Sequence, residues 1–399
     1  MNRVLILADH AWRDIPGLSA VRAYLEKLNP EVDCRIVDIH LFADSVELFK
    51  PHLVLINHLH DRNRNKIVDT VRRRGGLCVV LPTEGRPNST ALLDWATTSW
   101  PAQLCDLYLS WSEVFASHLP ASVDRAVTGC PRFDFYFLPF TGLVNSKTVV
   151  CSQYGLDPNK KIVTVASSFP HAKFALGGGE FIQRDWENLG ITKLPGREDA
   201  VKVARDVYRA MQDFKAHLYA ISRDADTQIL IKPHPAEDVR SWMTFCDEIG
   251  AKMMLTDYVF NLFSVSDIHV ARAECLTLVE ASIRGIDTDT FLAQDETYYE
   301  GPIHEVIVGD RKAYVEKWIG PMPGASGRVA NEISALLDKK KPKTYAEPTA
   351  EDFRKFHSLL VGHNRQYAVP QADYVGQYGK AVRLDETDRW TRGIASVIG

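Results

Sequence analysis

The alternation of short apolar runs with stretches of helical periodicity constrains this chain more than any other feature of its sequence. Residues 3–8 (RVLILA) and 34–38 (CRIVD) have strand character, and residues 18–28 between them carry apolar side chains at helical spacing. Further runs at 53–57 and 77–81 continue the pattern. Nearly continuous apolar strands are typical of a parallel sheet with helices on both faces, so an α/β fold built from βαβ units is predicted.

A break in this alternation separates two halves. A glycine-containing, loop-like segment covers residues 139–161, after which a strand (KIVTVA) restarts the cycle. We therefore predict a first domain over 1–150 and a second over 160–345, both doubly wound, Rossmann-type domains that face each other across a cleft. The aromatic-rich segment 346–399 lacks clear strands and is predicted to form helices that cross between the domains.

Composition excludes several classes of protein. The chain has 399 residues, 45% of them hydrophobic and 25% charged, as in average soluble proteins, and its formal charge of -4 gives no support for a nucleic-acid partner. Seven scattered cysteines without a CxxC pair indicate a reducing compartment. No run approaches the roughly 18 apolar residues of a membrane span, so a cytoplasmic location is predicted, with a visit to a membrane surface left open.

Polar residues gather at the predicted strand ends of the first domain, where ligands of such sheets bind. The cluster WRD at 12–14 stands just before the first predicted helix, and Arg62 and Glu84 follow the third and fourth strands. Asp14 or Glu84 can take the proton of an attacking hydroxyl group. Asp14 is explained equally well as a helix cap.

The second domain carries a similar group of polar strand ends. Ser167 and Ser168 follow its first strand, where their hydroxyl and backbone N–H groups suit a phosphate oxygen. In the stretch ILIKPHP, two prolines fix the backbone around His234, and Lys232 adds a positive charge. A rigid donor beside a cation suits a phosphate leaving group, although an isolated His-Pro pair is more simply a structural feature.

A predicted helix from residue 271 onward adds further candidates. Its early turns hold Glu274, Thr277 and Glu280. Thr277 lies near the positive end of the helix and suits a phosphate, and Glu280 suits ribose hydroxyls. Glu280 taken alone would be a solvated helix residue.

With these residues collected, the sequence resembles bacterial surface carbohydrate biosynthesis proteins, a group similar to GT-B glycosyltransferases. The resemblance spans most of the chain and rests on WRDIPGL at 12–18, GCPRFD at 129–134, KPHP at 232–235, ECLTLVEASIRG at 274–285 and GASGRVANEI at 324–333. Capsule transferases for Kdo and sialic acid share the KPHP and helix-borne glutamate elements, as do the glycerophosphotransferases of teichoic acid synthesis.

The resemblance implies where the substrates bind. The nucleotide sugar would lie on the second domain near Lys232, His234, Thr277 and Glu280, with the histidine at the phosphate of a CMP-sugar. The acceptor would face Arg13, Asp14, Arg62 and Glu84. The chain departs from the commonest pattern at Arg272 to Glu274, where small hydroxyl residues are frequent, which makes Arg272 a candidate substitute for a serine phosphate clamp.

The predicted function is a glycosyltransferase that moves Kdo or a nonulosonic acid from a CMP-sugar to a glycan or glycolipid of the bacterial surface. The alternatives are a UDP-sugar transferase, a UDP-sugar 2-epimerase of the same fold, and a non-catalytic glycan-assembly subunit. Peripheral association with the inner face of the membrane, or with other glycan-assembly enzymes, is compatible with this function.

The chemistry predicted for this enzyme needs carboxylates and no cofactor. Asp185, beside Arg184, is the candidate nucleophile of a double displacement, and Asp14 and Glu84 are the candidate bases. No metal is predicted, because the DxD spacings at 224–226 and 287–289 do not clearly follow strands that face the cleft.

Overall fold

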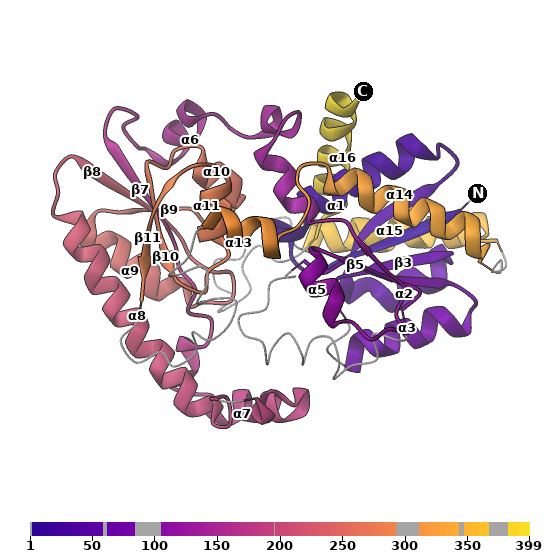
Figure 1. The fold of residues 1–399 in the computed structure, drawn as a ribbon, viewed down its shortest axis with the longest axis horizontal. Helices are drawn as coiled ribbons and strands as arrows, with labels where there is room; N and C mark the ends of the chain where they lie inside the picture. The colour runs from indigo at the N-terminus through magenta and orange to yellow at the C-terminus, as the bar shows by residue number, and fades with distance from the viewer. Residues whose placement is uncertain are drawn as a thin grey trace.

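Two parallel sheets organise the protein (Figure 1). The computed structural model describes residues 2–58, 62–83, 105–194, 196–292, 311–342, 347–366 and 382–399. The first sheet has the strand order β2-β1-β3-β4-β5-β6. Its strands are β1 (Arg3–Ala8), β2 (Asp33–Asp38), β3 (Leu53–Ile56), β4 (Leu77–Val80), β5 (Leu107–Ser110) and β6 (Arg125–Val127).

The second sheet has the strand order β11-β10-β7-β8-β9. Its strands are β7 (Lys161–Ala166), β8 (Thr227–Lys232), β9 (Lys252–Met253), β10 (Ile268–Arg272) and β11 (Asp287–Phe291). Every neighbouring pair in both sheets is parallel. The predicted α/β class with two doubly wound, Rossmann-type domains is confirmed.

The strand orders show where each sheet can bind a ligand. In the first sheet the chain passes from β1 to β2 on one side and then to β3 on the other, and in the second sheet β7 is flanked by β8 and β10. Such a reversal of strand order leaves a crevice at the carboxyl ends of the strands. The carboxyl ends of β1 and β7 are therefore the places from which a site is built.

The first helix begins earlier than predicted. α1 (Ala11–Leu28) includes the WRD cluster, which was expected to precede the helix, and Pro16 lies inside it. The reason is tertiary packing, because α1 is buried against the 3-10 helix η3 (Pro131–Tyr136). A Cβ atom on Gly17 would lie 3.1 Å from the backbone nitrogen of Arg132. The absence of a side chain at Gly17 therefore permits the close packing of α1 against η3.

The remaining helices of the two sheets have the following bounds. In the first half they are α2 (Phe42–Phe49), α3 (Arg62–Arg73) and α5 (Glu113–His118), and in the second half α6 (Lys147–Tyr154), α7 (Gly179–Leu189), α8 (Ala200–Ser222), α9 (Val239–Ile249), α10 (Val259–Phe263) and α11 (Thr277–Ile283). The prediction of a helix from residue 271 is wrong. The backbone N–H of Ala273 donates to the carbonyl of Phe291, which continues the pairing with β11, and Glu274 lies in the turn before α11.

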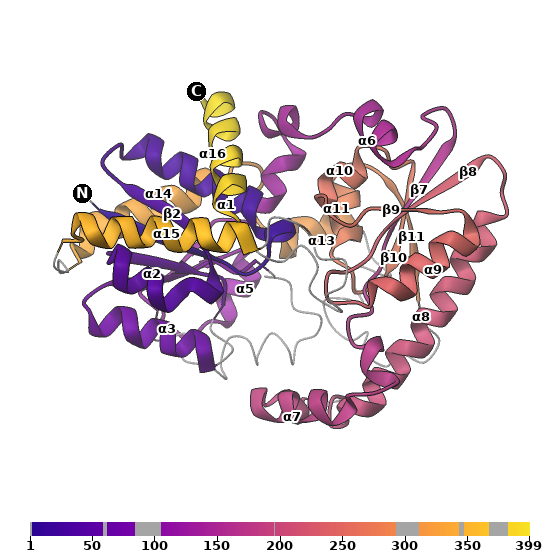
Figure 2. The ribbon, with the colours of Figure 1, turned by 180° about the vertical axis from the view of Figure 1, so that it is seen from behind.

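Four later helices are α13 (Arg311–Trp318), α14 (Ala325–Lys340), α15 (Ala350–Gln366) and α16 (Leu384–Ile398). The predicted boundaries assign α14 to the second domain, whereas its buried residues Val329, Ala330 and Ile333 share one core with β1 and α1. Figures 1 and 2 both place α14 and α15 beside the first sheet. The first domain is therefore assembled from segments far apart in the sequence.

α16 contacts both domains. The ring of Trp390 lies 5.4 Å from that of Phe135 in η3 and 5.1 Å from that of Tyr258, which precedes α10. Phe135 also stacks on Phe260 at 5.1 Å. Aromatic pairs of this kind contribute about 0.5–1.5 kcal/mol each to stability beyond the burial of their area. This cluster therefore stabilises the contact between the two domains.

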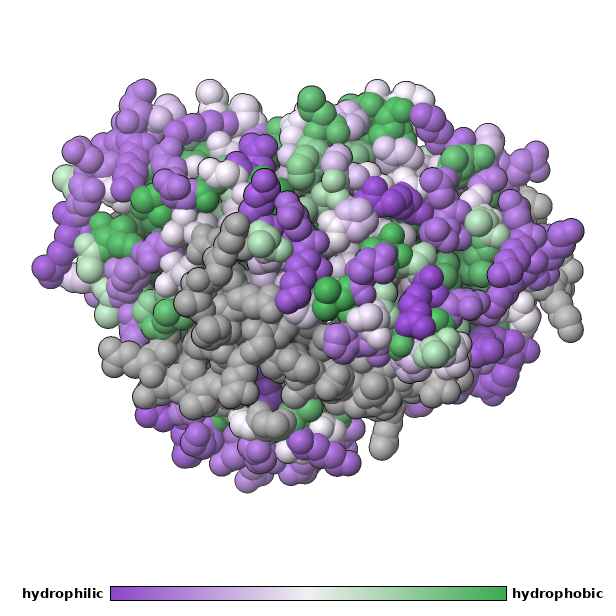
Figure 3. Space-filling view, in the orientation of Figure 1, coloured by the Kyte–Doolittle hydropathy of each residue, from purple (hydrophilic) through white to green (hydrophobic). Residues whose placement is uncertain are grey.

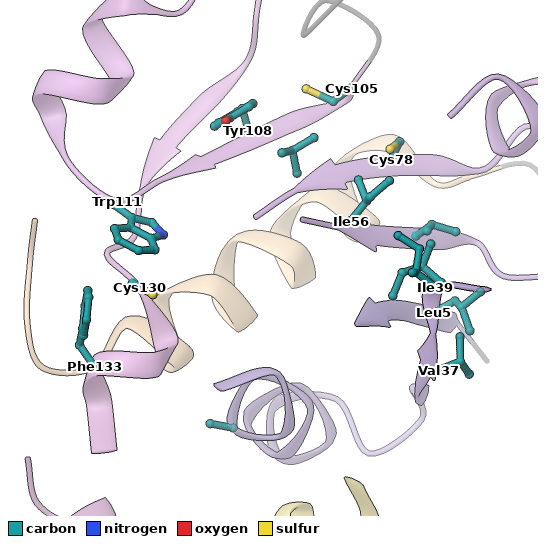
Figure 4. Close-up of a cluster of buried hydrophobic side chains, with 14 of the residues drawn as sticks. Leu5, Val37, Ile39, Ile56, Cys78, Cys105, Tyr108, Trp111, Cys130 and Phe133 are labelled. Carbon is teal, nitrogen blue, oxygen red and sulfur yellow. The ribbon is translucent and has the colours of Figure 1, made fainter. Parts of the chain in front are cut away.

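Apolar side chains fill the first domain on both faces of its sheet. Figure 4 shows part of one core, with Leu5, Ile56 and Cys78 on neighbouring strands and Trp111 beyond them. Hydrophilic residues cover much of the outer surface in Figure 3, with apolar ones in small groups. Within the described ranges, no helix combines the length and apolar character needed to cross a membrane.

Candidate active site between the two domains

A cavity of about 540 Å³ lies between the domains. This volume is in the range of small-molecule sites, about 300–1,000 Å³. Its lining from the first domain follows β1 and includes η3, and its lining from the second domain follows β7, β8 and β10. The residues that contribute polar groups are Asp9, His10, Trp12, Arg13, Arg132, Ser167, Ser168, His171, Arg197, Lys232, His234, Arg272, Glu274, Thr277 and Glu280.

The structure brings the predicted nucleotide-binding residues together. Those that line the cavity are Ser167, Ser168, Lys232, His234, Arg272, Glu274, Thr277 and Glu280. They converge because the carboxyl ends of β7, β8 and β10 lie side by side in the second sheet. Among the predicted acceptor residues, Arg13 also lines the cavity.

The structure does not bring the other predicted residues to the cavity. Asp185 is exposed on α7 and is absent from the lining. Asp14 is 2% exposed, lies in the first turn of α1 and is absent from the lining. Arg62 is the first residue of α3, with its side chain outside what the structure describes, and Glu84 lies outside the described residues.

Asp14 supports the start of α1. Its Oδ2 accepts hydrogen bonds from the backbone N–H groups of Asp9 and His10, at 3.1 and 3.0 Å. Its Oδ1 accepts one from Nε of Arg13 at 2.6 Å. The first N–H groups of a helix need such partners, and the ion pair also fixes the direction of Arg13. Asp14 is not the N-cap that the sequence left open, because the N-cap position is His10 and Asp14 lies within the first turn of α1.

His234 is held in one tautomer by its own turn. Its Nδ1 accepts a hydrogen bond from the backbone N–H of Ala236 at 3.1 Å, and its backbone N–H donates to Oγ of Ser167 at 3.0 Å. In the neutral ring, Nδ1 is therefore the acceptor and Nε2 carries the proton. The neutral ring thus has one N–H donor, at Nε2. The prolines on both sides of His234 restrict the backbone that carries this ring.

Glu237 lies behind the histidine, and sequence reasoning missed it. The carboxylate is 2% exposed and accepts hydrogen bonds from Oγ of Ser167 at 2.6 Å, from Nε1 of Trp242 at 2.5 Å and from the backbone N–H of Phe169. Burial raises the pKa of Glu237 to about 7. Since the hydroxyl proton of Ser167 is directed to Glu237, Ser167 orders the turn of His234 and does not donate to a ligand.

Thr277 is held by a buried histidine that the sequence also did not single out. His269 is fully buried in β10, with Nε2 2.8 Å from Oγ1 of Thr277 and Nδ1 3.0 Å from Oγ1 of Thr164. If Thr164 donates to Nδ1, then Nε2–H donates to Thr277 and leaves the Thr277 hydroxyl proton to point elsewhere. Oγ1 of Thr277 also lies 3.0 Å from Sγ of Cys275, so the threonine hydroxyl is held at the cavity wall from two sides.

The second-domain wall of the cavity is rich in cations. Nη1 of Arg272 contacts the carbonyl of Ser168 at 3.0 Å and Oε1 of Glu274 at 2.5 Å. Burial, together with the charges of Arg197 and Arg272, lowers the pKa of His171 to about 4. Burial also lowers the pKa of Lys232 to about 8, and its ammonium donates to the carbonyl of Asp257. A cavity with this charge distribution favours an anionic ligand.

No group of three or more histidine, cysteine or acidic side chains able to hold a metal ion occurs in the part of the chain that the structure describes. Of the two DxD stretches, Asp287 to Asp289 forms part of β11 and Asp224 to Asp226 lies in the turn after α8.

No protein-family model and no curated protein matches this chain. Among solved structures, it is similar to S. aureus MnaA determined with UDP, at 12% identity over 87% of this chain and 100% of that one, with a TM-score of 0.49. The UDP-GlcNAc 2-epimerase of Methanocaldococcus jannaschii is similar at 11% identity over 85% and 100%, with a TM-score of 0.48. The wall teichoic acid polymerase TagF is similar at 13% identity over 85% and 89%, with a TM-score of 0.44. These values are too low to carry a conclusion about activity.

Proposed function

We propose that the protein is a glycosyltransferase that binds a nucleotide sugar in the cavity, with the phosphate at the carboxyl ends of β7, β8 and β10. The observation that carries the proposal is the convergence there of a rigid N–H donor, His234, with the guanidinium of Arg272. Both are groups that bind phosphate oxygens well. They also stand at the reversal point of the second sheet, where doubly wound domains bind ligands.

In this proposal the leaving group is the nucleotide phosphate. As the bond between the anomeric carbon and the phosphate oxygen breaks, negative charge grows on that oxygen. A hydrogen bond from Nε2–H of His234 and the charge of Arg272 stabilise it, which is worth about 3–4 kcal/mol for a well-placed donor. The acceptor hydroxyl attacks the anomeric carbon and loses its proton to a carboxylate.

Asp9 is the first-domain carboxylate that we assign to this proton. It lines the cavity at the end of β1, with its side chain 19% exposed and 3.4 Å from Nη2 of Arg13. Asp14 and Asp185, which the sequence suggested, do not reach the cavity and receive no role in the reaction. A base within the cavity can approach a bound acceptor, as general base catalysis requires.

The donor that we favour is CMP-linked Kdo or a CMP-linked nonulosonic acid, and the acceptor a glycan or glycolipid. Arg13 and Arg132 line the cavity from the first domain. A sugar with its own carboxylate supplies a second anion that suits these cations. A UDP-linked neutral sugar carries its negative charge on the diphosphate alone and has no carboxylate on the sugar.

A nucleotide panel tests the proposal. We expect CMP and a CMP-linked acidic sugar to raise the melting temperature more than UDP or UDP-GlcNAc does, because binding to the native state adds RT ln(1 + [L]/Kd) to stability. Stabilisation by UDP compounds alone, or conversion of UDP-GlcNAc without any acceptor, would favour the epimerase or UDP-sugar alternative. Stabilisation by no nucleotide would favour a non-catalytic subunit.

Turnover tests the role of His234. His234→Ala should lower kcat by about 100- to 1,000-fold with the fold intact, since a transition-state donor is lost. The matched control is Asp185→Ala, an exposed residue outside the cavity, which should leave kcat unchanged. A His234→Ala enzyme within a few-fold of wild type would exclude the leaving-group role.

A further inference from the structure

Glu280 already has both carboxylate oxygens engaged by the chain itself. Oε1 lies 2.9 Å from Nη2 of Arg132, and Oε2 accepts a hydrogen bond from the hydroxyl of Tyr136. Both partners belong to η3, and the side chain of Glu280 is 1% exposed. A ribose hydroxyl would have to displace these partners from a buried carboxylate. The ribose contact expected from the sequence is therefore disfavoured by this geometry.

Arg132, in contrast, keeps donors for a ligand. A guanidinium has five N–H donors, and the ion pair with Glu280 uses Nη2. Its Nε is buried and has no hydrogen-bond partner among the residues that the structure describes. The side chain lines the cavity and is 14% exposed. Glu280 and Tyr136 thus hold the guanidinium in place while donors remain to be satisfied.

Arg132 and two other arginines of the cavity are each held by acidic side chains. Nη1 of Arg272 donates to the carbonyl of Ser168 and to Glu274. Arg13 forms ion pairs with Asp14 and Asp9. The guanidinium fork matches a carboxylate or phosphate with two parallel hydrogen bonds. A neutral group in the same place would leave buried donors unpaired, which costs affinity.

We infer that Arg132, and not Glu280, contacts the bound donor at this point of the cavity, and that the group it contacts is anionic: a sugar carboxylate or a phosphate oxygen. Glu280 is then a positioning residue that acts through Arg132. This inference rests on the proposed function and deepens it, because it makes an acidic group a condition of donor recognition.

The test compares the affinities of cytidine, CMP and CMP-N-acetylneuraminate, measured by calorimetry, in wild type and variants. Arg132→Met should weaken binding of the acidic nucleotide sugar by at least about 30-fold, the lower end of the range for loss of one partner of a buried charged pair. If the contacted group is the sugar carboxylate, CMP binding should change less than threefold. If it is a phosphate oxygen, CMP should lose affinity by the same factor as the sugar nucleotide. Either result supports the inference.

The double variant separates contact from positioning. Arg132→Met with Glu280→Gln removes both charges of the buried pair, so that no unpaired charge remains to unfold the protein. Adding Glu280→Gln to Arg132→Met should change the affinity for the nucleotide sugar less than twofold. A further tenfold loss, present with cytidine as well, would show that Glu280 binds ribose itself and would overturn the inference.

Milder variants keep the test valid if Arg132→Met does not fold. Tyr136→Phe removes one hydrogen bond to Glu280 and no charge, and Arg132→Lys keeps the charge but loses the two-pronged geometry. Arg132→Lys should lose at least tenfold in affinity for the acidic sugar nucleotide, and unchanged affinity would overturn the inference. Wild type that binds neither CMP nor CMP-N-acetylneuraminate would overturn the proposed function and this inference with it. Binding by wild type with equal affinity in Arg132→Met would overturn the inference alone.

Discussion

Asp134 Oδ2 accepts two hydrogen bonds from Ser326, one from its backbone N–H at 2.8 Å and one from its hydroxyl at 2.6 Å, although the residues lie 192 positions apart in the chain. Its Oδ1 accepts two more, from the N–H groups of Gly324 and Ala325 at 2.7 and 3.0 Å. These N–H groups at the start of α14 have no partner within the helix. A side chain of η3 thus caps a helix that follows the whole second domain.

Loss of this cap should destabilise the protein. Asp134→Asn puts an amide N–H2 against N–H donors and removes the charge, so we expect a loss of about 2–4 kcal/mol in the free energy of unfolding. Urea denaturation measures it. The control is Asp338→Asn on the exposed face of α14, where less than about 0.5 kcal/mol is expected. Equal effects of the two substitutions would contradict the capping role.

Glu237 should make stability depend on pH. Its pKa is raised from 4.5 to about 7, so the native state holds a proton that the unfolded chain releases. The stabilisation from this group is fully present below pH 4.5 and is lost as the pH rises towards 7, at about 1.4 kcal/mol per unit. Glu237→Gln does not titrate.

The measurement for Glu237 is the difference in free energy of unfolding between Glu237→Gln and wild type, at pH 5 and pH 8. The difference should shift in favour of the variant by roughly 2–4 kcal/mol across this range. Other titrating groups are common to both proteins and cancel. A difference that stays constant with pH would show that Glu237 is ionised throughout.

His269 and Thr277 should act as one unit in donor binding. Thr277→Val should weaken nucleotide binding about tenfold, because a charge-assisted hydrogen bond to phosphate is lost. His269→Gln alone should weaken it by a smaller factor and should have no further effect in Thr277→Val, since it acts through the threonine. A double-mutant cycle on the Kd of CMP measures this coupling, and fully additive losses would argue against it.

Gly320 should tolerate no side chain. Its φ is +76°, and a Cβ atom would lie 1.6 Å from the carbonyl oxygen of Trp111. Gly320→Ala must therefore displace the backbone, and we expect a loss of about 3 kcal/mol or more in the free energy of unfolding. Gly142→Ala is the matched control, because nothing lies within 4 Å of its Cβ position. Thermal unfolding of the two variants side by side decides the matter.

Much of the second-domain wall of the site could be predicted from local sequence. Apolar runs of strand length mark β7 and β8, and parallel strands place their carboxyl ends at one edge of a sheet. His234, just beyond a strand end, could therefore be assigned to the site from its position, whereas Arg272 was identified only as a departure from the pattern of the resembling family. The same reasoning held for Thr277 even though α11 begins later than expected.

The contacts behind this wall could not be predicted, because they depend on packing between distant segments. Glu237 and His269 look like ordinary polar residues of a turn and a strand, and only the packed fold shows that they turn inward. Arg132 belongs to a short 3-10 helix with no periodicity of its own. Asp185 stands beside an arginine in the sequence, as in many catalytic pairs, but it faces solvent on α7.

The packing of α14 on the first sheet has a consequence for the order of folding. Val329 and Ile333 complete a core that includes Ile6, and Asn29 bonds to Ser334 across 305 positions of chain. The strands of the second domain, in contrast, come from one continuous stretch. Closing long segments costs entropy and slows folding, so we expect the second domain to gain protection first. Pulsed hydrogen exchange should show the amides of β7 and β8 protected before those of β1, and the reverse order would exclude this sequence of events.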